Sequence, residues 1–432
     1  IHTSDWHLGQ NFYGKSRSSE HQQFLTWLLS QVQAHNIDCV IVAGDIFDTG
    51  TPPSYAREMY FDFIVNMHEL KCQLIVLAGN HDSVAMLGES KQLLRSLSTR
   101  VIPNAISSQA NKESEAIDEQ VFYINDQQGE AKAVICAIPF IRPRDILTSQ
   151  AGQSANDKSQ SLQQAIKAHY DQLYQQAKKL SIISGNKTLP IIATGHLTTV
   201  GVTISESVRD IYIGTLEAFP ANAFPNADYI ALGHIHRAQK VANTEHIRYC
   251  GSPIPLSFDE AKQAKRILIV DFFQGKLVTV SEIQIPSFQP IMMVKTTLND
   301  LVRQVTEQVQ QLGELKHGQQ VWLDIEIESS DYLQDLHSRI EQLISDLPVE
   351  ILLVRRSKKS RQTMPNNQKK ITLNELSLTD VFNTRIAQEN WQTDAEKALK
   401  ERLTTLFQQA VSEVKSSGNQ GKEEQVKSEG EP

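Results

Sequence analysis

The sequence has 432 residues, of which 40% are hydrophobic and 21% are charged, enough for two or three domains with a sizeable core. Its formal net charge of −8 argues against a strongly basic nucleic-acid-binding protein, although a net charge does not locate the charges. No apolar run reaches the roughly 18–20 residues of a membrane span, and the four unclustered cysteines are typical of buried thiols in a reducing cytosol. We therefore predict a cytoplasmic protein without a membrane partner.

The chain opens with a carboxylate and an imidazole at Asp-x-His spacing, Asp5 and His7. Because the printed chain starts at Ile1 rather than Met, we expect a few residues of the first strand to precede it. The apolar run at 39–43 has the length and composition of a buried parallel strand. It ends in a glycine and delivers Asp45 to its carboxyl end.

The same order of apolar run, glycine and polar residue recurs three more times. The later runs lead to Asn80, to His196 and to the pair His234 and His236. Glycine before each polar residue lets the backbone turn sharply without a Cβ clash. Ligands of open α/β sheets gather beyond the carboxyl ends of the strands, so we expect these side chains to meet in one place.

Together these motifs supply two Asp, one Asn and four His as candidate metal ligands: Asp5, His7, Asp45, Asn80, His196, His234 and His236. Oxygen and imidazole donors without a thiolate suit Mn, Fe or Zn, and seven ligands are too many for one tetrahedral ion. The set predicts two divalent ions about 3.5–4 Å apart, with Mn²⁺ as the expected metal. Asp45 is central in the pattern and is the predicted bridge.

A helix predicted over 54–70 is apolar around most of its circumference, which indicates cover on both sides. Either an insertion of the same chain or a second copy could supply this cover. A second copy could also use the next predicted helix, 84–97.

Four polar residues in three places could contact a phosphate backbone. Arg142 and Arg144 are set by prolines in a loop after a predicted strand, and a salt-bridged surface loop explains their spacing equally well. Arg209 lies in a polar loop beyond His196. Ser252 lies in a rigid turn that could line the site.

Five segments are predicted along the chain. An α/β domain spans 1–286, and a smaller α/β cap without a ligand constellation spans 290–356. A basic stretch, 357–372, is either a solvated linker or a strap that faces a polyanion. Two amphipathic helices within 373–414 have no domain of their own to pack on and predict partner docking, and residues 415–432 have the composition of a disordered tail.

In order, the motifs Asp-x-His, Gly-Asp-x-x-Asp, Gly-Asn-His-Asp, Gly-His and Gly-His-x-His resemble those of the calcineurin-like metallophosphoesterases. Longer stretches look like the SbcD family of nucleases: His2–Gly9, Val42–Thr49, Leu77–Ser83, Ile141–Gly152, Thr194–Gly201 and Gly251–Phe258. The resemblance runs from residue 1 to roughly residue 410. It implies an α/β fold, with a metallophosphoesterase β-sandwich flanked by helices, a small α/β cap and C-terminal partner-binding helices.

The resemblance also implies a function. Members of this family act on DNA as ATP-stimulated double-strand exonucleases and hairpin endonucleases in repair, recombination and replication, at the nucleoid. They dimerise through helices placed like 54–70 and 84–97, which favours the homodimer over the insertion. They dock an SbcC-like ATPase through C-terminal helices, which the segment 373–414 would supply.

Two other functions compete with a nuclease. A scaffold that lost catalysis is disfavoured because every motif position is filled. A phosphomonoesterase of the same superfamily would resemble Gly-Asp-x-x-Asp-Arg-Gly and Gly-Asn-His-Glu, whereas this chain has Thr49 and Asp82 at the corresponding positions. A small-nucleotide phosphodiesterase or phosphatase stays the alternative.

We assign roles within the candidate site as follows. Asp5, His7 and His236 would hold one ion and Asn80, His196 and His234 the other, with Asp45 shared. His81 cannot easily aim at the same ion as the adjacent Asn80, so it is predicted to face the phosphodiester as a general acid. An eighth metal ligand is the rival role. Asp48 is predicted to orient His81 or a ligand.

Overall fold

A computed structural model describes residues 1–106, 119–147, 155–183, 187–208, 218–316, 318–328 and 336–356, with single positions at 386, 400, 402–404 and 407. Residues 1–359 form one compact unit and residues 360–432 another. The predicted basic linker, nearly all of the two predicted C-terminal helices and the predicted tail lie outside the described residues. The domain boundaries therefore stay predictions.

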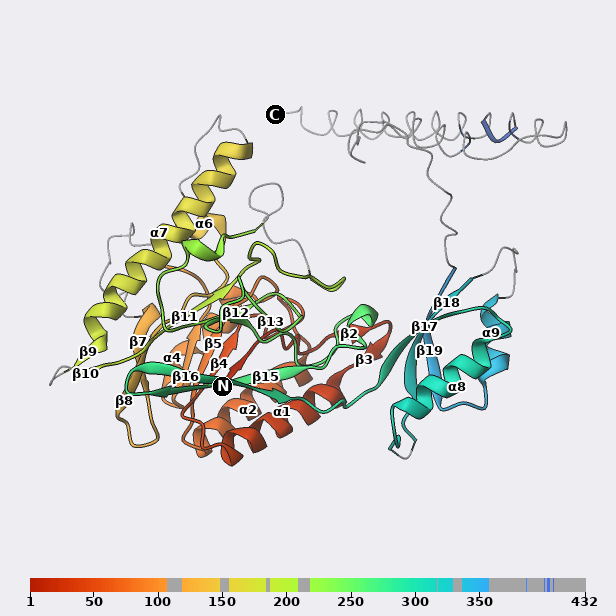
Figure 1. The fold of residues 1–432 in the computed structure, drawn as a ribbon, viewed down its shortest axis with the longest axis horizontal. Helices are drawn as coiled ribbons and strands as arrows, with labels where there is room; N and C mark the ends of the chain where they lie inside the picture. The colour runs from red at the N-terminus through yellow and green to blue at the C-terminus, as the bar shows by residue number, and fades with distance from the viewer. Residues whose placement is uncertain are drawn as a thin grey trace, which may run out of the picture. The chain divides into compact units, whose positions relative to one another are not determined.

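Two six-stranded sheets form the larger part of the first unit (Figure 1). The first has the order β16-β15-β1-β4-β5-β6 and contains β1 (His2–Thr3), β4 (Cys39–Ala43), β5 (Gln73–Leu77), β6 (Thr99–Ile102), β15 (Arg266–Phe273) and β16 (Lys276–Gln284). The second has the order β13-β14-β12-β11-β8-β7 and contains β7 (Val121–Asn125), β8 (Ala131–Cys136), β11 (Ile191–His196), β12 (Tyr229–Gly233), β13 (Gln239–Lys240) and β14 (Ile247–Tyr249).

The two sheets pack against each other through alternate residues of their central strands. Ile41 of β4 shares one apolar cluster with Ile135 of β8 and Ala231 of β12. The neighbours of Ile41 in the chain, Val40 and Val42, belong instead to the cluster on the opposite face. This alternation follows from the two-residue period of a strand, and it makes both faces of the central strands apolar.

Helices cover the outer face of each sheet (Figure 1). Helices α1 (Ser18–Ala34) and α2 (Ser54–Glu69) pack on the first sheet through residues such as Leu28 and Phe63. Helix α7 (Ala155–Ser181) packs on the second through residues such as Ile166. Each fully buried side chain of this size contributes about 1.5–3 kcal/mol relative to an exposed one. The predicted α/β fold is confirmed.

Two helix predictions need correction. The single helix predicted over 84–97 is wrong, because the chain forms α3 (Val84–Glu89) and α4 (Lys91–Arg95), which are separated at Ser90. Serine competes for backbone hydrogen bonds and favours helix ends. Helix α2 is buried on one side only, since Phe61 and Val65 on its other side are 39% and 46% exposed.

A third, smaller sheet contains three parallel strands in the order β17 (Ile291–Thr296), β18 (Val321–Ile327) and β19 (Val349–Arg356), with helices α8 (Leu301–Gln311) and α9 (Leu336–Ile344) as crossovers. Ile291 and Trp322 pack with Phe12 of β2 (Asn11–Phe12), which pairs with β3 (Lys15–Ser16).

The remaining described elements are short: α6 (Pro143–Ile146), β9 (Ile182–Ile183), β10 (Lys187–Thr188) and the 3-10 turns η1 (Ala221–Ala223) and η2 (Phe258–Glu260). None of the described helices is long and apolar enough to cross a membrane.

Candidate metal centre

The candidate ligands lie at the carboxyl ends of strands from both large sheets. Asp45 and Asn80 follow β4 and β5 of the first sheet, whereas His196 ends β11 and His234 follows β12 of the second. The backbone N–H of His234 donates to Asp5 Oδ1 over 2.9 Å, which joins residues 229 positions apart. Packing of the two sheets therefore brings together side chains that are remote in sequence.

The ligand atoms form two compact groups. In each group the atoms lie within 4.8 Å of one another, and the groups are Asp5, His7 and His236, and Asp45, His196 and His234. Asp45 Oδ2 is 3.2 Å from His196 Nε2 of its own group and 3.7 Å from His7 Nε2 of the other. Asp45 thus lies between the two groups, where a bridging carboxylate would lie.

Several candidate ligand atoms face one another with lone pairs, an arrangement that suits a bound cation. His196 Nδ1 donates to the carbonyl oxygen of Ala43 over 2.9 Å, so in a neutral ring its Nε2 carries a lone pair. That Nε2 lies 2.9 Å from Asn80 Oδ1 and faces Asp45 Oδ2, which are also lone-pair atoms. His7 Nε2 is buried and has no hydrogen-bond partner among the described residues. Positive charge in this space would satisfy all of these atoms.

The pKa values show the same electrostatic preference. Burial alone would lower the pKa of His196, but the charge and hydrogen bond of Asp45 raise it to about 9. Burial likewise opposes ionisation of Asp45, yet His196 and His7 together hold the pKa of its carboxyl well below the ordinary value. The site thus stabilises a negative Asp45 beside a positive charge.

The backbone of the site is strained. Asp5, His7, Asp45 and His234 all adopt positive φ angles, of 54°, 49°, 51° and 93°. Such angles cost residues other than glycine of the order of 1–3 kcal/mol each and persist only where the surroundings enforce them. Their concentration in four candidate ligands supports a functional role for this region.

Two glycines make room for candidate ligands. A Cβ at Gly44 would lie 2.1 Å from His196 Nδ1, and a Cβ at Gly79 would lie 2.1 Å from Asp45 Oδ1. The sequence predicts these glycines as turn residues, but the structure gives them a second task. They make room for ligands that come from neighbouring strands.

His81 and Asp48 lie beside the first group. The His81 ring Nδ1 is 2.7 Å from the backbone carbonyl of Asp48, while the Asp48 carboxylate contacts His7 Nδ1 at 3.0 Å. Asp48 therefore contacts a candidate ligand through its side chain and His81 through its backbone. His7, Asp48 and His81 also form a third group within 4.8 Å, so a ligand role for His81 stays open.

Asp82 has a structural role that the sequence analysis missed. Its buried carboxylate accepts hydrogen bonds from the backbone N–H groups of Ile46, Phe47 and Gly79, at 3.1, 3.0 and 2.8 Å. Burial, and then the charge of Asp45, raise the pKa of Asp82 to about 6 against the effect of these bonds. Asp82 ties the turn after β5 to the loop after β4. The only sequence signal for this role is the position of Asp82 directly after Gly-Asn-His.

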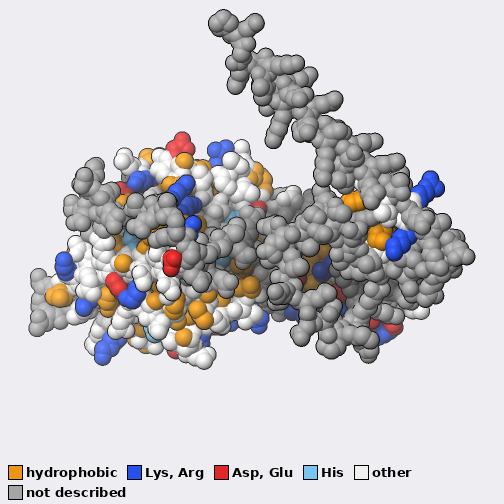
Figure 2. Space-filling view, turned by 90° about the horizontal axis from the view of Figure 1, so that it is seen from above, with side chains coloured by type: hydrophobic (Ala, Val, Ile, Leu, Met, Phe, Trp, Pro, Cys, Tyr) orange, Lys and Arg blue, Asp and Glu red, His pale blue; other side chains and the backbone are white. Residues whose placement is uncertain are grey.

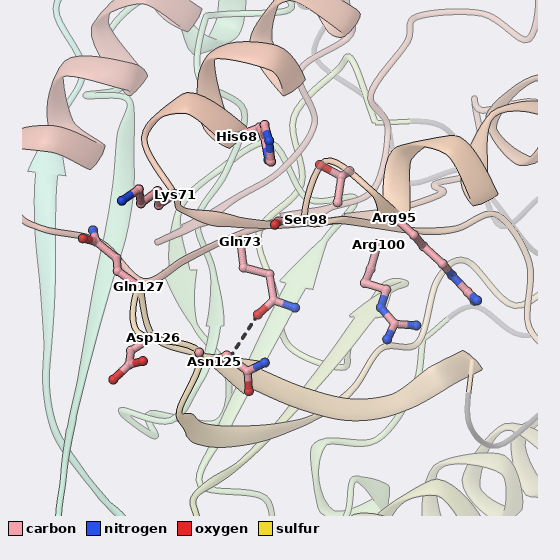
Figure 3. A pocket seen from close by; sticks show the side chains of 11 residues that line it. His68, Lys71, Gln73, Arg95, Ser98, Arg100, Asn125, Asp126 and Gln127 are labelled. Carbon is pink, nitrogen blue, oxygen red and sulfur yellow. Dashed lines mark hydrogen bonds between the residues drawn. The ribbon is translucent and has the colours of Figure 1, made fainter.

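A separate polar cleft lies at the amino ends of β5 and β6 in the first sheet (Figure 3). It has a volume of about 420 Å³ and is lined by Lys71, Arg95 and Arg100 among others. Gln73 and Thr99, which also line it, begin β5 and β6, whereas the candidate ligands follow the carboxyl ends of the strands. The cleft is therefore separate from the candidate metal centre.

Comparison with known proteins decides the family. Residues 1–238 match the model of calcineurin-like phosphoesterases, and residues 287–390 match the model of the Type 5 capsule protein repressor C-terminal domain. The SbcD subunit of nuclease SbcCD from Escherichia coli (strain K12) is 50% identical over 407 residues, which cover 94% of this chain and 97% of that relative. The chain belongs to the SbcD family.

Other SbcD relatives are more distant. The SbcD protein of Bacillus subtilis (strain 168) is 30% identical, with 78% of this chain and 81% of the relative covered. That of Rhodobacter capsulatus is also 30% identical, with 68% and 70% covered. The predicted family and the predicted class of enzyme, a metal-dependent nuclease that hydrolyses phosphodiester bonds, are confirmed.

The four residues predicted to contact DNA in this SbcD-family chain lie in different settings. Ser252 is fully buried and its hydroxyl donates to the Ile254 carbonyl at 2.9 Å, so a direct DNA contact from Ser252 is wrong. Arg142 is half-buried and donates to the Asp82 carbonyl at 3.0 Å, under the turn that carries Asn80. Arg144 has a side chain that is 79% exposed, whereas Arg209 lies outside the described residues.

On the face drawn in Figure 2, the described Lys and Arg side chains form no continuous basic patch. Lys and Arg side chains in Figure 2 stand singly or in small groups among neutral atoms on the face that it draws. Phosphate contacts to Lys and Arg supply much of the affinity for DNA, and on this face such side chains are scattered.

Proposed function

We propose that this chain is a two-metal DNA nuclease that uses Mn²⁺ and works with an SbcC-type ATPase. The observation that carries the proposal is the position of Asp45 Oδ2 between His196 Nε2 and His7 Nε2, at 3.2 and 3.7 Å. In this arrangement Asp5, His7 and His236 would hold one ion and Asn80, His196 and His234 the other, with Asp45 shared.

The residues of the chain prepare the site for in-line hydrolysis. When bound, the two ions would provide an acidified water and stabilise charge on the phosphoryl oxygens. Asp48 orients His7 by the 3.0 Å contact with Nδ1, and the Ala43 carbonyl orients His196. The backbone N–H of His81 donates to Asp45 Oδ1 over 2.9 Å, which keeps this imidazole beside the centre. We assign His81 the donation of a proton to the leaving oxygen.

The partners follow from surfaces and from the family. The names of the relatives refer to a complex, SbcCD, so we propose an SbcC-type ATPase as the partner of residues 373–414. We propose a homodimer through 54–70 and 84–97, which is supported by the exposed Phe61, Val65 and Leu93 on α2 and α4. These three side chains are 39%, 46% and 69% exposed, which favours a second copy over an insertion as their cover.

The proposed substrate is duplex DNA, cut from its ends as an exonuclease and at hairpins as an endonuclease, in the cytoplasm at the nucleoid. The cap at 290–356 would position the DNA, with Arg144 and the segment 357–372 as sources of phosphate contacts. Such contacts position a duplex without reading its sequence.

The test is digestion of end-labelled duplex and hairpin DNA, with a phosphomonoester and a cyclic dinucleotide as control substrates. We expect Mn²⁺-dependent cleavage of both DNA substrates that is stimulated by the ATPase partner and ATP. Hydrolysis of the control substrates without cleavage of DNA would contradict the proposal and favour a small-nucleotide phosphodiesterase or phosphatase.

A further inference from the structure

Three candidate histidine ligands have different contact partners at their Nδ1 atoms. His7 contacts the Asp48 carboxylate and His196 the Ala43 carbonyl, both of which can only accept a hydrogen bond. His236 Nδ1 instead lies 2.6 Å from the hydroxyl of Ser207. Because a hydroxyl can donate or accept, Ser207 alone does not determine which nitrogen of His236 carries the proton.

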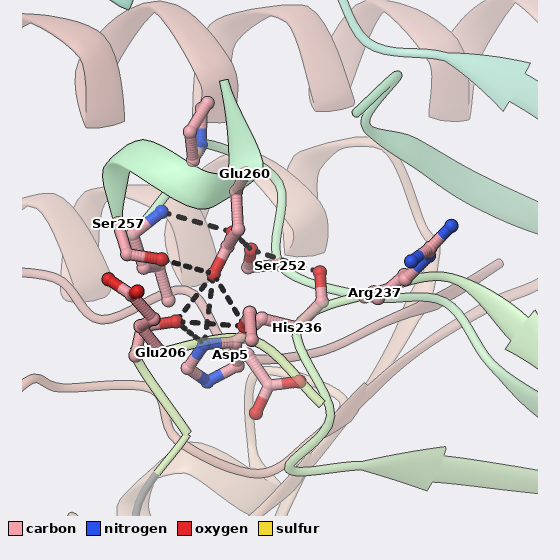
Figure 4. Close-up of polar contacts among 12 residues, drawn as sticks. Asp5, Glu206, His236, Arg237, Ser252, Ser257 and Glu260 are labelled. Carbon is pink, nitrogen blue, oxygen red and sulfur yellow. Dashed lines mark hydrogen bonds and ion pairs between the residues drawn. The ribbon is translucent and has the colours of Figure 1, made fainter. Parts of the chain in front are cut away.

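A buried carboxylate removes this ambiguity (Figure 4). The side chain of Glu260, in η2, is completely buried and points toward His236 and Ser257. Its Oε1 accepts hydrogen bonds from Ser207, Ser205 and Ser257 at 2.5, 2.8 and 3.1 Å. A carboxylate has no hydrogen to give, so the hydroxyl hydrogen of Ser207 is committed to Glu260.

The single hydroxyl hydrogen of Ser207 determines which ring nitrogen of a neutral His236 carries the hydrogen. With its hydrogen on Glu260, the Ser207 oxygen offers only a lone pair to His236 Nδ1, which must then carry the ring hydrogen. Nε2 is left unprotonated, as a metal ligand requires. Glu260 Oε1 lies 3.6 Å from Nδ1, too far for a direct hydrogen bond. Ser207 is therefore the necessary link.

The other side of Glu260 is also fixed. Its Oε2 pairs with the buried ammonium of Lys265 at 2.5 Å, and Lys265 donates to the backbone carbonyl of His236 at 3.1 Å. A buried ion pair contributes little net stability compared with apolar side chains of similar size. A stabilising role alone is thus a weak explanation for this charged pair behind a candidate ligand.

We propose that Ser207 and Glu260 are positioning residues that hold His236 in the tautomer and orientation needed to bind the ion of the Asp5, His7 and His236 group. The inference rests on the proposed function, because it takes His236 as a ligand. It assigns a metal-tuning role to two residues outside the candidate ligand set.

Titration of the purified full chain with Mn²⁺, followed by electron paramagnetic resonance of the free ion, tests this role. Loss of such an outer partner typically weakens metal binding by about 10–100-fold. We expect Ser207→Ala to lower the affinity for one of the two Mn²⁺ ions by this factor and to leave the affinity for the other unchanged. Ser207→Thr keeps the hydroxyl and should restore the affinity.

Ser205→Ala is the matched control. It also removes a hydroxyl that Glu260 Oε1 accepts, but Ser205 has no hydrogen bond to His236 among the described contacts. Equal loss of Mn²⁺ in the two alanine variants, or two ions at wild-type affinity in Ser207→Ala, would overturn the positioning role.

Two further results separate the assignments. Replacement of the ion pair by Glu260→Met with Lys265→Met should weaken the same ion, and unchanged affinity would remove Glu260 from the proposal. If the wild-type chain itself does not bind two Mn²⁺ ions, the proposed two-metal function fails instead.

Discussion

Gly44→Ala is expected to damage the metal centre although it replaces none of the candidate ligands. Gly44 has a φ of +96°, and an added Cβ would lie 2.1 Å from His196 Nδ1. Contacts this short do not occur, so His196 must move. The movement breaks the 2.9 Å hydrogen bond from Nδ1 to the Ala43 carbonyl and rotates Nε2 away from Asp45 and Asn80.

The expected magnitude has two parts. A residue other than glycine in a left-handed conformation costs about 1–2 kcal/mol. Loss of the bond between His196 and the Ala43 carbonyl leaves buried polar groups unpaired, at about 1–3 kcal/mol. For metal binding, we expect at least the roughly 10–100-fold weakening that loss of an outer partner causes, since here the ligand itself moves.

Gly129→Ala is the matched control. Gly129 has a similar φ of +84°, but its added Cβ would meet no described atom within 4 Å. Both variants carry the backbone cost, and only Gly44→Ala carries the clash. Thermal unfolding and Mn²⁺ titration of both variants give the comparison. Equal unfolding temperatures and two ions at wild-type affinity in Gly44→Ala would refute the reasoning.

Three other perturbations test separate parts of the mechanism and the fold. His81→Asn should lower DNA cleavage by about 10²–10⁴-fold, the usual worth of general acid–base catalysis, with both ions retained; loss of an ion, measured by metal analysis, would make His81 a ligand. Truncation after Thr372 should leave metal content unchanged and abolish co-purification with the SbcC-type ATPase, and retained co-purification would contradict the docking role. His2→Gln tests pH dependence, because burial lowers the pKa of His2 to about 3. Between that value and the roughly 6.5 of an unfolded chain, the unfolded state binds more protons, so stability falls as pH falls. Urea unfolding at pH 7.5 and 5.0 should show a smaller pH effect in the variant, and an equal effect would exclude His2 as a cause.

The sequence predicts much of the site because the chemistry is carried by strand ends. Asp45, Asn80, His196 and His234 each follow or end an apolar run, so their meeting could be predicted from the order of motifs alone. The structure assigns these runs to two packed sheets, in agreement with the β-sandwich that the family resemblance implies. Close approach of a glycine to a ligand, as at Gly44, depends on that packing and leaves no signal in the sequence.

Residues that hydrogen-bond to the candidate ligands could not be predicted either, because these contacts also depend on packing between segments remote in sequence. Glu260 is 24 residues beyond His236 and is linked to its ring through Ser207, 29 residues before that histidine. The predicted contact from Ser252 was wrong because the rigid turn around it faces inward, where Lys265 donates to its hydroxyl at 2.8 Å. Spacing shows that a turn is near the site but not which way its side chains point.

Metal analysis of Asp45→Asn beside Asp48→Asn tests the two-metal assignment most directly. Asp45 Oδ2 lies between two histidine nitrogens of different groups, whereas the Asp48 carboxylate contacts His7 Nδ1 of one group at 3.0 Å. We predict that Asp45→Asn lowers the affinity for both ions and abolishes Mn²⁺-dependent digestion of duplex DNA. Asp48→Asn should lower the affinity for one ion only. Two tightly bound ions in Asp45→Asn would contradict the shared role of this carboxylate.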